Sequence, residues 1–330
     1  MSESNFSYLS LTPELQLDAL ASVGVYPETG LIQLNSYENR VSLFTDENKI
    51  RYVVKFYRPH RWSEAQLLED HTFSLLLKEK GCCLSEPVIL ENKTLFEFQG
   101  YYFALFKSLS ARSLELDNLD HLYEVGVALG KLHQSSSQHH FQNRETLDIE
   151  TLLSAPIKQL KESKLVPTFV RDELFSIMDS IEKLTTELFN QHTFPEICLH
   201  GDVHASNILM DGEIPYFVDF DDCKTGVAMQ DIWMLLNGDE QDQQLQLSTI
   251  LEGYEEEFEF DTQQIKLIEP LRSMRIIHYV NWINKRWEDS AFPVNFPWFS
   301  TDQYWNELLQ SLKQQMTNMQ KAPLSIQPAY

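Results

Sequence analysis

The hydrophobic periodicity of this chain changes near residue 112, and this change limits the folds that the chain can adopt. Before it, four runs have the short apolar or aromatic and β-branched composition of strands. These runs are LIQL (31–34), VSLF (41–44), IRYVVKFYR (50–58) and YYFALFK (101–107). Residues 63–81 instead carry leucines and Phe73 at helical spacing, with Ser63 as a candidate N-cap and Gly81 as a stop. We predict a small sheet with one inserted helix.

Beyond residue 112, apolar residues recur at steps of three and four, the spacing of an amphipathic helix. Helices are predicted at 117–133, 170–189, 228–237, 243–258, 262–287 and 301–319. Short strands are predicted near 196–200, 207–210 and 215–220. The sequence thus predicts an α+β chain of two lobes: a sheet lobe over 1–107, a hinge at 108–112, and a larger, mainly helical lobe over 113–330. Ligands favour the cleft between such lobes.

The charge of the chain limits its partners. It has 49 acidic and 26 basic residues, a formal net charge of −23. Such a surface repels nucleic acid and anionic lipid, so neither is expected as a partner. No apolar run approaches the roughly 20 residues that cross a bilayer, and the polar start lacks the pattern of a signal peptide. We therefore expect a cytoplasmic protein, and a monomer.

The segment LHGDVHASNILM (199–210) concentrates polar residues between apolar ones. Asp202 and Asn207 are separated by four residues, and Asp219 follows after twelve more, inside the apolar run YFVDF. A carboxylate there is costly to bury unless a cation compensates it. Phosphoryl transfer needs such a set, because one carboxylate accepts the proton of the attacking hydroxyl while an amide and a second carboxylate hold a hard cation.

This spacing matches the catalytic loop and the D-F-G aspartate of protein kinases, with D-F-D (219–221) in place of D-F-G. A kinase-like fold then needs a lysine on a strand of the first lobe, and VVKFY supplies Lys55. It also needs an acid on the next helix to hold that lysine. Glu69 is the predicted partner, with Glu64 and Asp70 as alternatives. The segment NSYENR, although it has no glycine, is the predicted phosphate-covering loop, with Ser36 as a donor.

Several of these segments together resemble the aminoglycoside phosphotransferase and choline kinase branch of the kinase-like fold, and within it a group of bacterial stress-response kinases. They are SYENRV, VVKFYRP, LHGDVHASNIL, FVDFDD, QDIWMLLNGD and FPWF, so the resemblance covers nearly the whole chain. It implies an enzyme that uses ATP and Mg²⁺ to phosphorylate serine and threonine. It also implies that Asp231 braces the catalytic loop.

The resulting site prediction joins the motif to the cleft. The predicted catalytic residues are Asp202, as proton acceptor, and Asp219. The predicted Mg²⁺ ligands are Asn207 and Asp219. The predicted ATP contacts are Ser36, Lys55, Glu69 as partner of the lysine, and Phe106 and Leu109 beside the adenine.

Two departures separate this chain from eukaryotic protein kinases. Only eleven residues, 220–230, lie between Asp219 and Asp231, and no A-P-E motif follows, so there is no room for a peptide-docking activation segment. The catalytic loop reads H-G-D rather than H-R-D, without the arginine that reads loop phosphorylation. Protein serine or threonine is the predicted acceptor, and a small alcohol such as an amino alcohol, a sugar or an aminoglycoside is the alternative.

Other interpretations of the polar residues stay open at this point. Alternation of His200, Asp202 and His204 also suits a metallohydrolase, and a nucleotide-binding pseudokinase has no need of Asp202. Asp221 and Asp222 suit a second cation site or a solvated turn. The aromatic residues Trp282, Trp287, Phe296 and Trp298 suit a substrate pocket or the core. The arginines at 272, 275 and 286 suit a phosphate or acidic substrate, or an ion-paired helix face.

Overall fold

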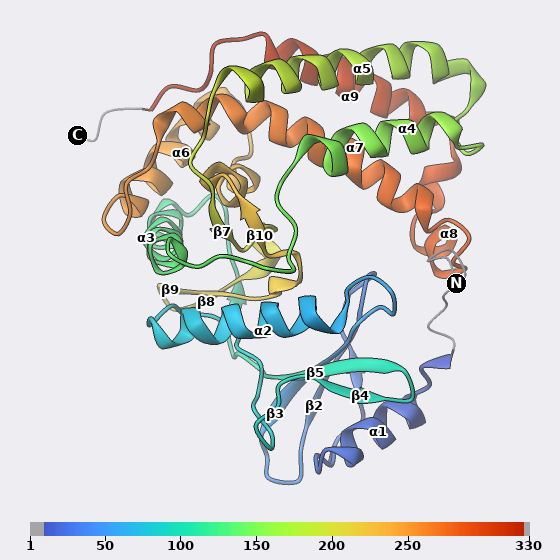
Figure 1. Cartoon of the computed structure of the whole chain (residues 1–330), viewed down its shortest axis with the longest axis vertical. Helices are drawn as coiled ribbons and strands as arrows, with labels where there is room; N and C mark the ends of the chain where they lie inside the picture. Colours follow the sequence, from blue (N-terminus) through green and yellow to red (C-terminus); the bar gives the residue numbers. More distant parts are fainter. Residues whose placement is uncertain (1–9, 327–330) are drawn as a thin grey trace.

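The structure is a computed structural model that describes residues 10–326. Figure 1 shows a sheet with its helices at one end and a larger group of helices at the other. The N-terminal sheet is antiparallel, with strand order β1-β2-β3-β5-β4. Its strands are β1 (Ile32–Gln33), β2 (Arg40–Thr45), β3 (Arg51–Phe56), β4 (Phe96–Phe98) and β5 (Tyr101–Lys107). The predicted α+β, kinase-like bilobal fold is confirmed, while its lobe boundaries stay a prediction.

Side chains of the N-terminal sheet alternate between two faces, as the two-residue period of a strand requires. Val54 and Phe56 of β3 pack with Phe103 of β5 in a buried cluster that includes residues of helix α1 (Pro13–Ser22). Lys55, between Val54 and Phe56, therefore lies on the other face, toward the helical lobe. Helix α1, capped by Thr12, is an addition to the one inserted helix that the sequence predicts.

Helix α2 (Glu64–Glu79) is that inserted helix, and it lies between the sheet and the C-terminal lobe (Figure 1). Ser63 forms a capping box with Gln66, as its position predicts. One end of the helix buries Leu67 in a small cluster with residues of the sheet, while Phe73 belongs to the main core of the C-terminal lobe. Helix α2 therefore packs against both lobes.

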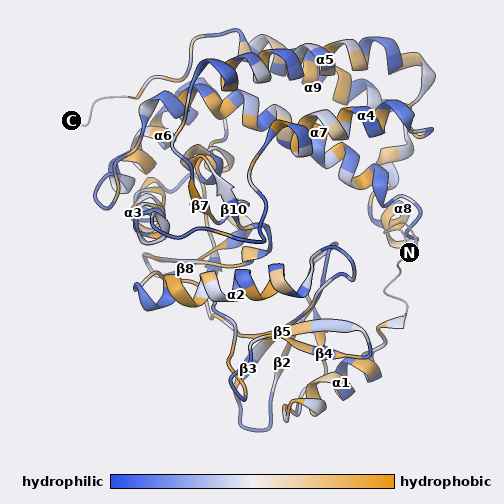
Figure 2. Ribbon diagram, viewed as in Figure 1, coloured by the Kyte–Doolittle hydropathy of each residue, from blue (hydrophilic) through white to orange (hydrophobic). Residues whose placement is uncertain are grey.

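The C-terminal lobe is built from helices around one large core. They are α3 (Leu119–Ser136), α4 (Ala155–Glu162), α5 (Thr168–Gln191), α6 (Glu240–Tyr254), α7 (Ile268–Lys285), α8 (Ala291–Asn295) and α9 (Asp302–Met319). Figure 2 shows hydrophobic and hydrophilic residues interspersed along them, as in helices that bury one side. Helices α3 and α6 approach so closely that a Cβ at Gly126 would lie 2.2 Å from the carbonyl oxygen of Ile250. No helix within residues 10–326 is long and apolar enough to cross a membrane.

Short strands in this lobe place the motif loops. They are β6 (Arg112–Ser113), β7 (Ile197–Leu199), β8 (Ile208–Asp211), β9 (Ile214–Phe217) and β10 (Lys224–Gly226). β7 pairs with β10, while β8 lies between β6 and β9, all antiparallel. The loop from β7 to β8 carries the H-G-D segment, and the chain after β9 carries D-F-D. Strand pairing thus brings together two loops that are separate in sequence.

Three predicted elements differ from the structure. The helix predicted at 228–237 is two 3₁₀ turns, Ala228–Asp231 and Trp233–Leu235, because the Asp231 carboxylate is held by the neighbouring loop. The helix predicted from 262 begins with a 3₁₀ turn and becomes α-helical only at Ile268. The strand predicted over 215–220 ends at Phe217, because Asp219 adopts a left-handed conformation with φ of 67°.

Candidate active site

The loop that carries Asp202 is fixed by backbone contacts. Gly201 has a φ of +87°, and a Cβ there would lie 2.1 Å from the carbonyl oxygen of Asp222, so the position requires glycine. The buried Asp231 carboxylate accepts hydrogen bonds of 2.8 Å from the backbone N–H groups of His200 and Gly201. His133 contacts the same carboxylate at 3.1 Å. The structure thus shows Asp231 in the bracing position that the resemblance implies.

Asp202 follows this fixed turn and lies between two basic side chains. Arg275 Nη1, from α7, is 2.7 Å from one carboxylate oxygen, and His204 Nε2 is 3.5 Å from the other. Burial raises the pKa of Asp202, but the hydrogen bond from His204 and the charge of Arg275 outweigh it and hold that pKa below its usual value. The carboxylate is therefore ionised at neutral pH and able to accept a proton.

Asn207 and Asp219 supply an amide and a carboxylate beside this loop. The Asn207 amide nitrogen donates to the Asp202 carbonyl oxygen at 3.0 Å, which leaves its Oδ1 for a ligand. The Asp219 side chain is 46% exposed and its backbone is left-handed, a conformation that costs free energy in a residue other than glycine. His200 Nε2 contacts the Val218 carbonyl oxygen at 2.9 Å. This ring nitrogen therefore stabilises the backbone next to Asp219 and is not available as a ligand.

Lys55 contacts two acids of the D-F-D-D segment. Its Nζ lies 2.5 Å from Asp219 Oδ1 and 2.6 Å from Asp221 Oδ1. Burial lowers the pKa of Lys55, but the charges of Asp219 and Asp221 outweigh it and hold the pKa above its usual value. The side chain thus stays charged, and the strand prediction for Lys55 in β3 is confirmed.

The structure does not bring Glu69 to Lys55, and that predicted pairing is wrong. The Glu69 carboxylate instead accepts hydrogen bonds from three consecutive backbone N–H groups, those of residues 142–144. Asp70, one position along the helix, is the acid of α2 that is buried on the lysine side. Burial and then the charge of Asp221 raise the pKa of Asp70 to about 7, so it is a poor anionic partner for the lysine near neutral pH.

Two cavities adjoin between the lobes. The β5-side cavity measures about 290 Å³, and its lining includes Val41, Val53, Lys55, Phe106, Leu109 and Leu209. The α7-side cavity measures about 530 Å³, and its lining includes Tyr37, Asp202, Lys224, Arg275, His278 and Trp282. Six residues line both: Asn35, Ser36, Ser206, Asn207, Asp219 and Asp221. All predicted site residues except Glu69 therefore line one cavity or both.

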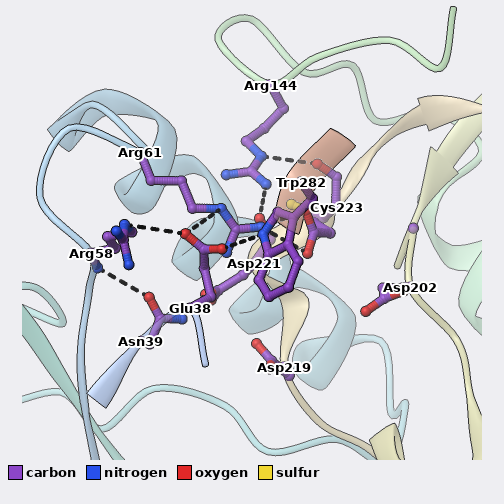
Figure 3. A network of polar contacts seen from close by, with 12 residues as sticks. Glu38, Asn39, Arg58, Arg61, Arg144, Asp202, Asp219, Asp221, Cys223 and Trp282 are labelled. Carbon is purple, nitrogen blue, oxygen red and sulfur yellow. Dashed lines mark hydrogen bonds and ion pairs between the residues drawn. The ribbon is translucent and has the colours of Figure 1, made fainter. Parts of the chain in front are cut away.

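A buried polar network lies beside the boundary between the two cavities, which is formed by the six residues that line both. The sequence alone did not suggest this network (Figure 3). Glu38, from the predicted phosphate-covering loop, accepts from Trp282 Nε1 at 2.6 Å and from Arg286 at 2.9 Å. Arg61 donates to both carboxylate oxygens of Asp222, at 2.9 and 3.0 Å. The partners come from both lobes and are up to 248 residues apart, so no local pattern could have revealed them.

The same network includes Asp221 and Asp222, for which the sequence allowed a second cation site or a solvated turn. Asp221 is buried and bonded to Lys55 and to the Asn39 amide, at 2.5 Å for the latter. Asp222 is paired with Arg61 and its side chain is 33% exposed, so burial excludes a solvated position for Asp221 alone. Of the aromatic set, only Trp282 lines the α7-side cavity. No group of three or more His, Cys, Asp and Glu residues within 10–326 is arranged to hold a metal ion, so the structure lacks the ligand set of a metallohydrolase.

The fold and the two adjoining cavities define the class of the protein: a kinase-like phosphotransferase. Residues 30–268 match the Phosphotransferase enzyme family. The chain belongs to this family, which confirms the resemblance predicted from its motifs.

Two similar proteins also carry the names of kinases. Stress response kinase A of Escherichia coli (strain K12) is 43% identical over 331 residues, with 100% of both chains covered. Serine/threonine protein kinase RdoA of Salmonella typhimurium (strain LT2) is 42% identical, also over 100% of both chains.

Solved structures share the fold at low sequence identity. The amicoumacin kinase hAmiN in complex with AMP-PNP, Ca²⁺ and Ami has a TM-score of 0.74 at 17% identity, covering 94% of each chain. A microcompartment-associated aminopropanol kinase has a TM-score of 0.73 at 15% identity, covering 93% of this chain and 98% of the other. Choline kinase LicA from Streptococcus pneumoniae has a TM-score of 0.63 at 14% identity, covering 92% and 98%.

Proposed function

We propose that this phosphotransferase is an ATP- and Mg²⁺-dependent kinase that transfers the γ-phosphate to serine or threonine hydroxyls of a protein substrate. The observation that carries the proposal is that Asn207 and Asp219 line both cavities, while Asp202 lines the α7-side cavity and Lys55 the β5-side cavity. One cavity thus suits a nucleotide and the other an acceptor, with phosphate between them. The name of the Salmonella relative, serine/threonine protein kinase RdoA, favours a protein acceptor.

The β5-side cavity is the proposed adenine pocket. Phe106 and Leu109 form one wall, and the apolar side chains of Val41 and Val53 add to it. Such walls suit a flat heteroaromatic ring. Lys55 also lines this cavity, where its positive charge offsets the repulsion between a polyphosphate and a protein of net charge −23. Ser36, which lines both cavities, can donate its hydroxyl to a phosphate oxygen.

The donor set at the boundary fits Mg²⁺. Asn207 Oδ1 and the Asp219 carboxylate are hard oxygen ligands, and phosphate and water oxygens complete the sphere in sites that keep few protein ligands. An Mg²⁺ ion held by these two side chains would supply positive charge that neutralises the charge developing on the phosphates in transfer. The exposed side chain of Asp219 can adjust to such an ion, because within residues 10–326 only Lys55 forms an ion pair or hydrogen bond with its carboxylate.

Asp202 is the proposed proton acceptor. Its carboxylate is ionised at neutral pH and lies in a loop that Asp231 holds rigidly. An acceptor hydroxyl in the α7-side cavity that donates to this carboxylate is oriented toward a phosphate on the Asn207–Asp219 side. Positioning and electrostatics then supply most of the rate enhancement, because the transferred group needs no covalent help from the protein.

The sheet lobe over 1–107, the hinge at 108–112 and the helical lobe over 113–330 are the proposed units, and the protein is proposed to act as a cytoplasmic monomer. A kinase for small alcohols is the second candidate. The short segment between Asp219 and Asp231, with no peptide-docking element, favours it. So does the likeness in fold to an aminopropanol kinase.

Labelled ATP distinguishes the two candidates. The protein is incubated with γ-labelled ATP and Mg²⁺ together with generic protein substrates, and separately with amino alcohols, sugars and aminoglycosides. We expect label on serine or threonine of protein, and its loss in Asp202→Asn. Label on the small alcohols alone would overturn the protein-kinase proposal, and equal labelling by Asp202→Asn would overturn the proposed role of Asp202.

A further inference from the structure

The wall of the α7-side cavity that faces Asp202 is basic, although the chain as a whole is strongly acidic. Arg275 and His278 come from α7, one turn apart, and Lys224 comes from β10. Burial lowers the pKa of His278 to about 4, and the charges of Lys224 and Arg275 add to this effect. His278 is therefore neutral, and the two positive charges on the wall are those of Arg275 and Lys224.

Every acid that lines this cavity already has a partner within the protein. Asp219 and Asp221 contact Lys55, and Asp222 contacts Arg61. Glu38 contacts Arg286 and Trp282. Asp202 is paired with Arg275, and Asp219 and Asp202 are in addition the proposed metal ligand and proton acceptor. Each carboxylate that lines the cavity thus already faces a cation of the protein.

The two cations, in contrast, have capacity to spare. The Arg275 side chain is 43% exposed, and its one ion pair with the described part of the chain is to Asp202 through Nη1. The Lys224 side chain makes no hydrogen bond or ion pair of 4 Å or less to residues 10–326; its charge helps to lower the pKa of Asp222, and its Cε lies beside Gly201, next to Asp202. A guanidinium and an ammonium on one wall suit a carboxylate or phosphate, which the guanidinium can bind through two parallel hydrogen bonds.

We propose that the acceptor hydroxyl lies next to an anionic group, and that Arg275 and Lys224 bind this group. For a protein acceptor, this means a serine or threonine flanked by acidic or phosphorylated residues. When the anion takes Arg275, the Asp202 carboxylate loses its ion pair and becomes available to the hydroxyl. Binding of the acceptor thus frees the Asp202 carboxylate from Arg275, so that it can accept the hydroxyl proton.

The net charge of −23 does not argue against an acidic acceptor at contact distance. At physiological ionic strength charges more than about 8 Å apart are largely screened. An anion inside the cavity therefore responds chiefly to the side chains that line it. The distant acidic surface slows the approach of such a substrate, and this effect weakens as salt is added.

Three serine peptides that differ only in the two residues beside the serine test this inference: both Asp, both Asn or both Lys. We expect the Asp peptide to exceed the Asn peptide in kcat/KM by about tenfold, the size of one partly exposed ion pair with good geometry. The Lys peptide should be the poorest substrate. In the double variant Arg275→Gln, Lys224→Gln the ratio of Asp to Asn peptide should fall to about one, and Arg275→Glu should favour the Lys peptide.

Arg272→Gln is the matched control, because Arg272 lies on the same helix but outside the α7-side cavity, where it donates to Gln243 at 3.1 Å. It should keep the wild-type preference for the Asp peptide. Preference of the wild type for the Lys or Asn peptide, or survival of the Asp preference in the double variant, would overturn the inference.

Because this inference rests on the proposed kinase function, the two must be able to fail separately. Glycerol phosphate, glycerol and choline, offered with the same labelled ATP, form the small-molecule arm. Transfer to glycerol phosphate rather than to the peptides would support the anionic acceptor while overturning the protein substrate. Transfer to choline would overturn the inference and leave a kinase. Transfer to none of the six acceptors would overturn the proposed kinase function and this inference with it.

Discussion

The two cavities between the lobes differ in how their charges are held. At the β5-side cavity, Lys55 is locked between Asp219 and Asp221, and apolar walls complete the space. At the α7-side cavity and within residues 10–326, the Arg275 side chain has one ion-pair partner, and the Lys224 side chain has no hydrogen-bond or ion-pair partner of 4 Å or less. The lysine site is thus preorganised by contacts between the two lobes, whereas the cations of the α7-side cavity can exchange their partners.

This difference separates nucleotide binding, which the shared fold provides, from the choice of acceptor, which is particular to this protein. A locked lysine between two acids suits one unchanging ligand, a nucleotide with its metal ion. Cations with few contacts suit recognition of a variable acceptor, because an anionic group of the acceptor can take the place of their present partner. Changes at the boundary and the β5-side cavity should therefore abolish turnover or stability, while changes at the α7-side cavity should alter the choice of substrate.

The largest expected effect is at the boundary. Asp219→Ala should lower turnover of Mg-ATP by about 10³-fold or more, since it removes a proposed metal ligand and a charge that organises the phosphates. Steady-state ADP formation measures this. Asp211→Ala, at the exposed end of β8, is the control and should behave as wild type. Unchanged activity in Asp219→Ala would contradict the proposed site.

The next effect concerns the locked lysine. Lys55→Met leaves Asp221 buried with the Asn39 amide as its remaining partner, and breaking a buried pair in this way costs about 3 kcal/mol of unfolding free energy. Lys49→Met breaks the exposed pair with Glu28 and should cost less than about 1 kcal/mol. Urea unfolding compares the two. Equal losses would show that the Lys55 pair is not effectively buried.

A smaller effect is expected with pH, behind the β5-side cavity. His71 is buried, contacts Tyr57 and Thr94, and packs edge-on against Phe106. Burial lowers its pKa to about 4, below the unfolded value near 6.5. The unfolded chain therefore binds an extra proton between these values, so stability is lost as pH falls through this window, by about 2 kcal/mol between pH 7 and pH 5.

His71→Gln should reduce that pH dependence by the same amount, while lowering stability at pH 7 through the loss of its packing. Urea unfolding of both proteins at pH 7 and pH 5 measures the difference. An identical pH dependence in wild type and His71→Gln would show that His71 is not the group that titrates.

The smallest effect is expected at the loop that borders both cavities. Glu38→Gln weakens the contacts of this loop with Trp282 and Arg286 and should lower stability by about 1 kcal/mol. KM for the acceptor should rise more than KM for ATP, because Trp282 lines only the α7-side cavity. Glu47→Gln, in the turn between β2 and β3, serves as the control. An equal rise in both KM values would mean that the loop serves both cavities alike.

Spacing along the sequence predicted what depends on local geometry. Asp202, Asn207 and Asp219 lie in loops joined by paired strands, so their separations fix their approach. Lys55 followed from the alternation of a strand. Adjacent acids on a helix, in contrast, point about 100° apart, and the pattern around Glu69 and Asp70 did not fix which of them turns toward the lysine.

Features that depend on distant partners could not be predicted. Residues 228–237 have the three-residue spacing of a helix, but buried 3₁₀ turns produce the same spacing, and the contacts of Asp231 decided between them. The pairing of Glu38 with Arg286 spans the molecule. For the arginines of 262–287 the sequence favoured a solvated or ion-paired face over a substrate site, and the cavity then separates Arg275 from Arg272.

Asp202→Asn tests most directly whether the two cavities meet in one phosphotransfer site. Calorimetric titration should give a Kd for Mg-ATP within about threefold of wild type, because Asp202 lines the proposed acceptor cavity and not the proposed nucleotide cavity. Single-turnover transfer of the γ-phosphate to the acceptor should fall by about 10³-fold, the contribution of a positioned base. Transfer at the wild-type rate, with Mg-ATP bound normally, would contradict the site.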